Sequence, residues 1–532
     1  MAKNQKWVIF SLALASLLAF IMYSIPNSKA SENMAMVTMF EPDESAMVPI
    51  IKRMVGPHPN LVHTVYRFVA YGFYSYGFPH FAPSAVVLKL LSWFGQGENL
   101  PLMMLSMRQL ISVLPMIASL WVLVYVQDQF KTWRSVALLA FLLAVPAVVQ
   151  NGYWWHPDGL VMLFSSLVLF FLWKDNRSFG KHFYFAAILC GILVALKVVG
   201  FFFFLTIAVV LVWGLIEKRL TWKQFFSKGL QFILIMALAI VAASPHLLIP
   251  NHRALAFNVL KREILETSKG YGVFYEKGLA SAWPTMHAFY GEAVFLVTVL
   301  GVSVWSLWDE KTRFLRVLVL SWFVPLSTHL LFFSHFKYQY WLPVALPMFS
   351  NMIMLLPKEK KDWQDHNKSR LVRILLLAIV ILQFGLFIKK DVDLFRVRNT
   401  RAENNSSIQF YEKALVELAP VTQDKLVYYD YRLYMPEKQG WMIENSFDLL
   451  TYDYIHSRNF DLLFLSQQRI RDYLHPSAIG IDPTTFAQSQ AFYRDADEEK
   501  LEGYKLLLRD ETVLLYIRED LCEKYYSADR CD

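Results

Sequence analysis

Long apolar runs, separated by short polar connections, fill residues 1–389 of this chain of 532 residues. Most of the runs are about 17 to 26 residues long, and a helix of roughly 20 residues crosses the ~30 Å hydrocarbon core of a bilayer. The pattern therefore predicts an α-helical polytopic membrane protein with about eleven membrane-spanning helices. We expect these helices at 7–25, 101–126, 134–150, 159–173, 181–196, 198–216, 229–249, 285–308, 315–334, 338–356 and 370–388.

Beyond residue 389 the sequence becomes mixed polar and charged, and no later run is long enough to cross a membrane. The spacing of its apolar residues predicts an amphipathic helix at 407–418. Short strands are predicted at 425–430, 460–466, 504–509 and 512–518. We therefore expect a membrane domain over 1–389 and a small soluble α/β domain over 390–532.

The predicted first outer loop, 26–100, contains a segment at 64–94 that is apolar enough to cross the membrane itself. This segment is rich in aromatic residues and is interrupted by Gly72, Gly77, Pro79 and Pro83. Both features favour interfacial helices that lie along the membrane surface. A full crossing would instead reverse the side of every later segment, and would separate the two acid motifs described below.

Lysine and arginine residues concentrate in alternate short connections of the membrane domain. This basic set includes the connections near residues 3–6, 131–134, 174–181, 218–223, 311–313 and 358–361, whereas the opposite short loops 151–158 and 335–337 hold only Lys337. Basic connections face the cytoplasm in most membrane proteins. We therefore expect a cytoplasmic N-terminus, with 26–100, 151–158, 250–284 and everything after 388 on the outer side.

The first apolar run has an alternative interpretation as a cleaved secretory signal, since Lys3 and Lys6 precede it and small residues lie near Ala30. Its length, and Lys29 beside that site, favour an uncleaved first span. The sequence shows no long extension and no retention signal. We expect the bacterial inner membrane, with the C-terminal domain in the periplasm.

Apolar residues make up 55% of the chain and charged residues 18%, and the net charge is +8. The basic cytoplasmic connections account for most of this charge, which therefore gives no evidence for a nucleic acid partner. The sequence contains no glycine-rich phosphate loop followed by Lys-Ser or Lys-Thr, and no CxxC or HExxH metal spacing. We expect no cofactor and no metal site.

The three cysteines fall into two groups. Cys522 and Cys531 lie on the predicted outer side, where oxidation is permitted, and they form either a disulfide or two free thiols. Cys190 lies inside a predicted span and is expected to be a packing residue.

The polar residues of the predicted outer face include two acid motifs. Asp43 and Glu44 follow the first span, and Asp158 lies in a His-Pro-Asp-Gly motif, so these three are the candidate catalytic residues. The candidate cations for a donor phosphate are Lys197, Arg108, Arg253, Arg262 and Lys337. The candidate substrate-binding residues are His156, Trp155, Tyr338 and Tyr340. Such a face can hold a lipid phosphate with its cations while a carboxylate activates a hydroxyl.

Each of these residues also fits a structural role. Asp43 follows a proline, as is typical of a helix start, and Asp158 suits a turn. Lys197 suits a side chain that reaches the membrane interface, and Arg108 suits the anchor of a span end. The aromatic residues beside His156 fit an interfacial belt.

The motifs and the arrangement of spans together resemble a known family. The acidic pair Asp43 and Glu44, the His-Pro-Asp-Gly loop, the Ala-Leu-Lys turn that ends at Lys197 and the run 335–347 look like the GT-C superfamily of glycosyltransferases. That group includes protein O-mannosyltransferases and bacterial lipid A aminoarabinose transferases. The resemblance covers about residues 1–390.

This resemblance implies transfer of a sugar from a polyprenyl-phosphate donor to an acceptor hydroxyl, with inversion at the anomeric carbon. Asp43 is then the expected base, because a positioned carboxylate speeds proton transfer by ~100- to 10,000-fold. Asp158 or Glu44 would stabilise positive charge on the sugar, and the cations would neutralise the leaving phosphate without a metal. The expected partners are the lipid-linked donor, an acceptor lipid, protein or polysaccharide, and membrane lipids.

Two other function classes remain open. A transporter or flippase for lipid-linked sugars would also need cations, although transporters tend to place ionisable groups near mid-membrane, whereas here they lie at span ends. A membrane scaffold whose outer domain binds a partner would tolerate Asp43→Asn and would be damaged by truncation near residue 390.

Overall fold

The computed structural model describes residues 3–269, 277–357, 367–445, 450–478 and 483–531. The chain forms two compact units. The first contains Met1–Ser28, Val48–Lys261 and Lys277–Asn399, and the second contains Lys29–Met47, Arg262–Glu276 and Thr400–Asp532. The predicted division into domains at residue 389 stays a prediction.

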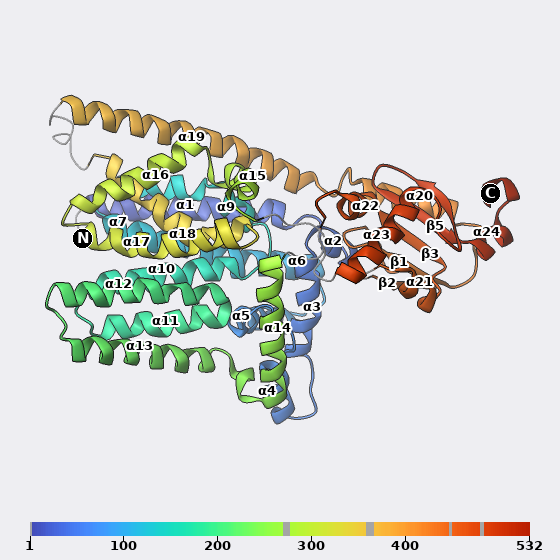
Figure 1. Ribbon diagram of the computed structural model, residues 1–532, viewed down its shortest axis with the longest axis horizontal. Helices are drawn as coiled ribbons and strands as arrows, with labels where there is room; N and C mark the ends of the chain where they lie inside the picture. The colour runs from blue at the N-terminus through green and yellow to red at the C-terminus, as the bar shows by residue number, and fades with distance from the viewer. Residues whose placement is uncertain (1–2, 270–276, 358–366, 446–449, 479–482, 532) are drawn as a thin grey trace. The chain divides into compact units, whose positions relative to one another are not determined.

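The first unit is helical throughout its described residues, with most helices lying side by side. Figure 1 shows α10, α11, α12 and α13 as neighbouring rods, in agreement with the contacts between them. Its helices are α1 (Lys3–Asn27), α4 (Leu61–Val69), α5 (Phe78–Trp93), α6 (Leu100–Met107), η1 (Arg108–Val113), α7 (Leu114–Asp128), α8 (Arg134–Leu143), α9 (Pro146–Asn151), α10 (Asp158–Asp175), α11 (Lys181–Leu196), η2 (Val198–Phe202), α12 (Phe203–Ile216), α13 (Trp222–Ala242), η3 (Pro245–Leu248), α15 (Leu279–Tyr290), α16 (Ala293–Trp305), η4 (Ser306–Trp308), α17 (Arg313–Thr328), η5 (His329–Phe333), α18 (Tyr338–Ser350), η6 (Asn351–Leu355) and α19 (Asn367–Thr400). Two more helices, α3 (Pro42–Val55) and α14 (Pro250–Lys269), contribute to both units.

Six helical segments of the described chain are long and apolar enough to cross a membrane: Gln5–Asn27, Leu100–Asp128, Val198–Ile216, Trp222–Ala242, Arg313–Phe333 and Leu371–Thr400. The helices α15 and α16 would form a seventh span if they count as one, but they are bent by 85°. These segments identify an integral membrane protein, although the predicted number of eleven spans is not confirmed.

One predicted span, 134–150, is interrupted in the structure. The helix α8 ends at Leu143, and Val145 adopts an extended backbone with ψ of 121° before Pro146 begins α9. The proline ring disfavours the helical conformation of the preceding residue, and this breaks the run although the residues around the break are apolar. Hydrophobicity alone therefore overestimated the length of this helix.

The segment 64–94 forms two helices of unequal character, α4 and α5. On α4, Leu61 and Val62 are 77% and 80% exposed, and Val65 is also exposed. Neither α4 nor α5 belongs to the six long apolar segments found among the described residues. A short helix with exposed apolar residues is typical of a membrane interface, and the interfacial position of this segment stays a prediction.

Buried apolar and aromatic side chains hold the first unit together. At its centre the indole of Trp322 stacks on Phe203, with ring centroids 3.7 Å apart. The helices α11 and α13 approach closely at Gly191, where a Cβ atom would lie 2.5 Å from the carbonyl oxygen of Met236. Such close packing fixes the end of α11, which carries a site residue described below.

The second unit contains a five-stranded sheet with the order β2-β1-β3-β5-β4. The strands are β1 (Lys425–Tyr429), β2 (Trp441–Glu444), β3 (Leu462–Ser466), β4 (Tyr504–Arg509) and β5 (Val513–Arg518). The strand β1 pairs in parallel with β2 and β3, whereas β5 pairs antiparallel with β3 and β4. The four predicted strands are present. The sequence did not predict β2, a four-residue edge strand whose Met442 is 70% exposed.

The second unit also contains helices, several of which contact the sheet, so it has the predicted α/β fold. They are α2 (Met34–Phe40), α20 (Ser406–Glu417), α21 (Tyr452–Arg458), α22 (Gln467–Leu474), α23 (Pro483–Asp497), α24 (Glu519–Tyr525) and α25 (Ala528–Cys531). Apolar side chains from α20, such as Phe410 and Ala414, pack with Val427 and Leu515 of the sheet in one buried cluster.

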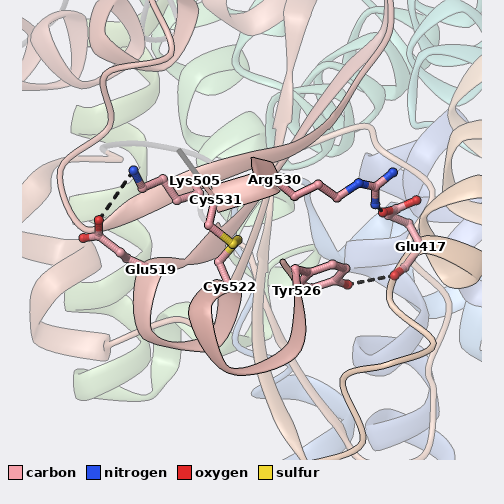
Figure 2. The surroundings of a disulfide bond; sticks show 7 residues. All are labelled: Glu417, Lys505, Glu519, Cys522, Tyr526, Arg530 and Cys531. Carbon is pink, nitrogen blue, oxygen red and sulfur yellow. Dashed lines mark hydrogen bonds and ion pairs between the residues drawn. A yellow bond between two sulfur atoms is a disulfide. The ribbon is translucent and has the colours of Figure 1, made fainter. Parts of the chain in front are cut away.

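The disulfide between Cys522 and Cys531 is present, which resolves the two alternatives for these cysteines (Figure 2). It ties α24 to α25 at the end of the chain. Nearby, the Tyr526 hydroxyl donates to the carbonyl of Glu417 at 2.7 Å, and Arg530 forms an ion pair with the Glu417 carboxylate. The third cysteine, Cys190, is buried within α11, as expected for a packing residue.

Candidate active site

The acid motif of the first unit is built at the start of α10. Asp158 follows Pro157 as the first residue of this helix, where the unpaired backbone N–H groups favour a negative charge. Its carboxylate is buried and contacts a lysine and a histidine. Its Oδ1 lies 2.6 Å from the Nζ atom of Lys197, and its Oδ2 forms an ion pair with Nδ1 of His156.

The ion pair between Asp158 and Lys197 brings together residues that the sequence placed in separate motifs. Lys197 caps the C-terminal end of α11, with an extended backbone after the helix. Burial by itself raises the pKa of the Asp158 carboxyl, but the charges of Lys197 and His156 bring that pKa well below its usual range. Asp158 is therefore an ionised and weakly basic carboxylate, suited to holding a cation rather than to taking a proton.

A second predicted cation, Lys337, lies beside the same aromatic ring as Lys197. The Nζ atom of Lys197 is 4.4 Å from the ring centroid of Tyr340, and the Nζ atom of Lys337 is 5.8 Å from the same centroid. The side chain of Lys197 keeps 21% of its surface exposed. Two ammonium groups beside one aromatic ring can together neutralise an anionic group such as a phosphate.

His156 is fixed from several directions. The ring of Trp154 stacks on it with centroids 4.0 Å apart and planes within 2° of parallel, and the Tyr76 hydroxyl lies 2.9 Å from its Nε2 atom. The backbone N–H of His156 donates to Oγ of Ser112 at 3.1 Å, and that hydroxyl donates to the His156 carbonyl at 3.2 Å. Ser112 belongs to η1, a π-helical turn, and π-helical turns are common at functional sites.

Gly159, the last residue of the motif, allows η1 to approach. A Cβ atom at this position would lie 2.5 Å from the carbonyl oxygen of Ser112. The sequence analysis therefore found the motif but missed Tyr76 and Ser112, which hold it. A glycine directly after an acid is a weak signal of close backbone approach, and it gives no information about the partner.

Two predicted site residues of the first unit lie in its interior. Arg108 is fully buried and donates from a guanidinium nitrogen to the carbonyl of Asn27 at 2.8 Å, at the end of α1. Trp155 is also fully buried and donates from its indole N–H to Oγ of Ser84 at 3.0 Å. An arginine at a helix C-terminus stabilises the free carbonyls, as Arg108 does here, whereas the buried Trp155 does not fit the alternative of an interfacial belt. A role of either residue in substrate binding stays a prediction.

Tyr338 stands next to the second cation at the start of α18. Its ring stacks on Phe289 with centroids 4.5 Å apart, and its carbonyl accepts a hydrogen bond from the Tyr290 hydroxyl. The side chain of Tyr338 is thus packed in the first unit, whereas its neighbour Tyr340 faces the two lysines.

Asp43 and Glu44 belong to the second unit, in the first turn of α3. Pro42 begins this helix, and acidic residues in the first turn interact favourably with its N-terminal dipole. The Glu44 side chain is fully buried, whereas Asp43 is half-buried. Just before them, Glu41 accepts a hydrogen bond from Arg401 at 2.8 Å, an ion pair that the sequence analysis missed.

The last two predicted cations, Arg253 and Arg262, lie on α14 with exposed side chains. Beside Arg253, the two ring nitrogens of His252 bind the hydroxyls of Tyr74 at 2.6 Å and of Tyr66 at 2.9 Å. The Tyr74 ring also stacks on His246, and burial followed by the nearby His252 lowers the pKa of His246 to about 4.

No group of three or more metal-ligating side chains occurs among the described residues.

No protein-family model matches the chain, and no curated protein matches its sequence. Solved structures do match its fold. ArnT from Cupriavidus metallidurans bound to undecaprenyl phosphate is 12% identical with a TM-score of 0.55, and the match covers 96% of this chain and 98% of ArnT.

An archaeal protein matches as well. The oligosaccharyltransferase AglB from Archaeoglobus fulgidus, in complex with an inhibitory peptide and a dolichol-phosphate, is 11% identical with a TM-score of 0.54, over 89% of this chain and 71% of AglB. A structure of the Archaeoglobus fulgidus oligosaccharyltransferase tethered to an acceptor peptide with an NVT sequon is 12% identical with a TM-score of 0.53, over 90% and 72% of the two chains. The chain therefore shares its fold with ArnT and AglB, in agreement with the resemblance of its sequence motifs.

Proposed function

We propose that the protein is a membrane glycosyltransferase that moves a sugar from a polyprenyl-phosphate donor to an acceptor hydroxyl. The observation that carries this proposal is the buried ion pair between Asp158 and Lys197, with Lys337 beside the same aromatic ring. It provides a prepared cationic site in a fold of which one solved example holds undecaprenyl phosphate and another a dolichol-phosphate.

The proposed reaction has two requirements that residues of this chain can meet: removal of the acceptor proton and neutralisation of the leaving phosphate. The acceptor hydroxyl must lose its proton, for which Asp43 is the proposed base and Glu44 its buried neighbour. The acceptor oxygen then bonds to the anomeric carbon as the bond to the phosphate oxygen breaks, and attack from the opposite side inverts that carbon. The departing phosphate gains negative charge, which Lys197 and Lys337 neutralise.

In this scheme Asp158 acts on the lysine rather than on the acceptor. Its carboxylate is buried and ionised, and it positions the ammonium of Lys197 through a contact of 2.6 Å. A preorganised cation stabilises the leaving group without reorganising during the reaction. This interpretation separates the two acid motifs into a base, Asp43, and a positioning carboxylate, Asp158.

The proposed orientation has the N-terminus in the cytoplasm and the C-terminal domain in the periplasm of a bacterial inner membrane. Two observations support it: basic residues concentrate in one set of connections, and the second unit contains the Cys522–Cys531 disulfide. Disulfides persist in oxidising compartments and are rare in the cytosol. The acceptor would then be a lipid, protein or polysaccharide of the outer side.

Reporter fusions test whether the two acid motifs share a compartment. Fusions after residues 45 and 158 are expected to report the periplasmic side, because positive connections flank both segments on the other side. A fusion near residue 220, in a basic connection, provides the matched cytoplasmic control. If the fusions at 45 and 158 report opposite sides, the two motifs cannot form one site and the proposed enzyme is excluded.

The activity itself is tested with the purified protein in lipid. A panel of polyprenyl-phosphate sugars is offered with lipid, peptide and polysaccharide acceptors, and both sugar transfer and released polyprenyl phosphate are measured. We expect turnover of one donor, and the sugar consumed identifies that donor. Movement of lipid-linked sugars across the bilayer without cleavage of any donor would contradict the enzyme and favour a transporter.

A further inference from the structure

A short segment between α4 and α5, residues 70–77, contacts residues that adjoin both halves of the Asp158–Lys197 ion pair; we call it the strap. The Tyr76 hydroxyl lies 2.9 Å from Nε2 of His156, on the side of the acid motif. The next residue, Gly77, donates its N–H to the carbonyl of Leu196 at 3.3 Å, directly before Lys197. Two consecutive residues therefore connect to the carboxylate and to the lysine.

The contact at Gly77 leaves no space for a side chain. A Cβ atom built there would lie 1.8 Å from the carbonyl oxygen of Ala195 and 2.7 Å from Cα of Leu196. The obstacle is backbone, which cannot rotate away as a flexible side chain can. The strap is thus seated against the turn that ends in Lys197, and it cannot shift without moving that turn.

The contact at Tyr76 sets the hydrogen bonding of His156. The carboxylate of Asp158 can only accept, so the Nδ1 atom of His156 carries the hydrogen that faces it. Its Nε2 atom then forms the second hydrogen bond of the ring with the Tyr76 hydroxyl, which can donate to a neutral imidazole and accept from a protonated one. A continuous chain of contacts runs from Tyr76 through His156 and Asp158 to Lys197.

We propose that Tyr76 is a positioning residue for the donor phosphate, acting through His156 and Asp158 to hold Lys197 in place. This inference rests on the proposed function. A carboxylate held by His156 on one oxygen keeps its other oxygen aimed at Lys197, and His156 is itself held by Tyr76 at one edge and by Trp154 on one face. Loss of the Tyr76 hydroxyl removes the hydrogen bond to His156, the first of these contacts.

The test compares Tyr76→Phe with Tyr74→Phe in the full-length protein. Tyr74 lies in the same strap, but its hydroxyl binds His252 at 2.6 Å and not the acid motif. Binding of undecaprenyl phosphate, kcat and donor KM are measured for both. For Tyr76→Phe we expect the Kd of undecaprenyl phosphate and the donor KM to rise together by about 10-fold, the size of one lost hydrogen bond, with a smaller change in kcat. For Tyr74→Phe we expect all three to stay within about 2-fold of wild type.

A double-mutant cycle shows whether Tyr76 acts through His156. In His156→Asn the amide nitrogen can still face Asp158, whereas the group that bound Tyr76 is lost. We expect the double variant Tyr76→Phe with His156→Asn to bind undecaprenyl phosphate as His156→Asn does alone, because the same contact is already broken. If the two substitutions raise the Kd of undecaprenyl phosphate independently, so that their effects multiply, the proposed action of Tyr76 through His156 is overturned.

Gly77→Ala gives a second test from the other end of the strap. It forces the turn before Lys197 to move, so it is expected to raise the same Kd while Tyr76 keeps its hydroxyl. Equal binding and KM for Tyr76→Phe, Tyr74→Phe and wild type overturns the inference even if the enzyme is active. A wild-type protein that neither binds undecaprenyl phosphate nor cleaves any donor instead overturns the proposed function, and this inference falls with it.

Discussion

Asp43→Asn is expected to lower kcat for sugar transfer by ~100- to 10,000-fold, the range that a positioned general base contributes. Asparagine has nearly the same shape as aspartate, and it retains a hydrogen-bond acceptor at the start of α3, but it cannot take the proton of an acceptor hydroxyl. The fold around Pro42 should therefore survive. The measurement is single-turnover transfer from the donor identified above, with binding of undecaprenyl phosphate expected to stay within about 2-fold.

Glu41→Gln provides the matched control for this substitution. Glu41 lies two residues before Asp43, and its carboxylate is paired with Arg401 at 2.8 Å. Neutralising it should reduce stability while leaving kcat near the wild-type value, because it has no role in the proposed chemistry. Full turnover by Asp43→Asn, together with a loss in Glu44→Gln, would move the base to Glu44; a loss confined to Asp158 variants would move it to the other motif.

The sequence predicted the parts of the site that are encoded by local patterns. The apolar runs indicated a membrane protein, and the resemblance to the GT-C superfamily drew attention to Asp158 and Lys197 before their contact was known. Their pairing was not predictable from spacing, because it depends on how α10 and α11 pack, and the two residues lie 39 positions apart. Periodicity describes one helix at a time, whereas the site lies between helix ends.

Tyr76 and Arg108 show that a local sequence does not reveal which partner a polar side chain meets in the fold. Tyr76 is one tyrosine in an aromatic-rich segment, so nothing in its local sequence distinguishes it from its neighbours; only the fold brings it to His156. Arg108 carries a charge at a predicted span end and therefore attracted a functional prediction, but its guanidinium caps the end of α1. An isolated cation in a long apolar run can bind a ligand or cap the C-terminus of a helix, and the sequence does not distinguish these two roles.

Variants of the Asp158–Lys197 pair should affect the free energy of unfolding and the rate of sugar transfer differently. In Lys197→Met the buried carboxylate of Asp158 loses the lysine with which it forms an ion pair. In Asp158→Ala the ammonium group of Lys197 loses the carboxylate. Removing one partner of a buried pair costs about 3 to 5 kcal/mol, and we expect the lower end because Lys197 keeps a fifth of its side-chain surface exposed. Equilibrium unfolding of the purified protein in mixed micelles measures this loss.

The double variant Asp158→Ala with Lys197→Met removes both charges, and it is expected to recover at least half of the free energy lost by either single change, because no unpaired buried charge remains. The exposed Lys52–Glu98 pair is the control, since its side chains are 40% and 87% exposed and Glu98→Gln should cost less than about 1 kcal/mol.

The double variant should not regain sugar transfer even where it regains stability. If Lys197 neutralises the leaving phosphate, the stable double variant still lacks that cation and should remain at least ~100-fold slower than wild type. A double variant that is both stable and fully active would show that the pair only holds α10 to the end of α11, and that Lys337 or another cation carries the phosphate. The two measurements together therefore decide between a structural ion pair and a preorganised catalytic one, a distinction that neither burial nor distance makes alone.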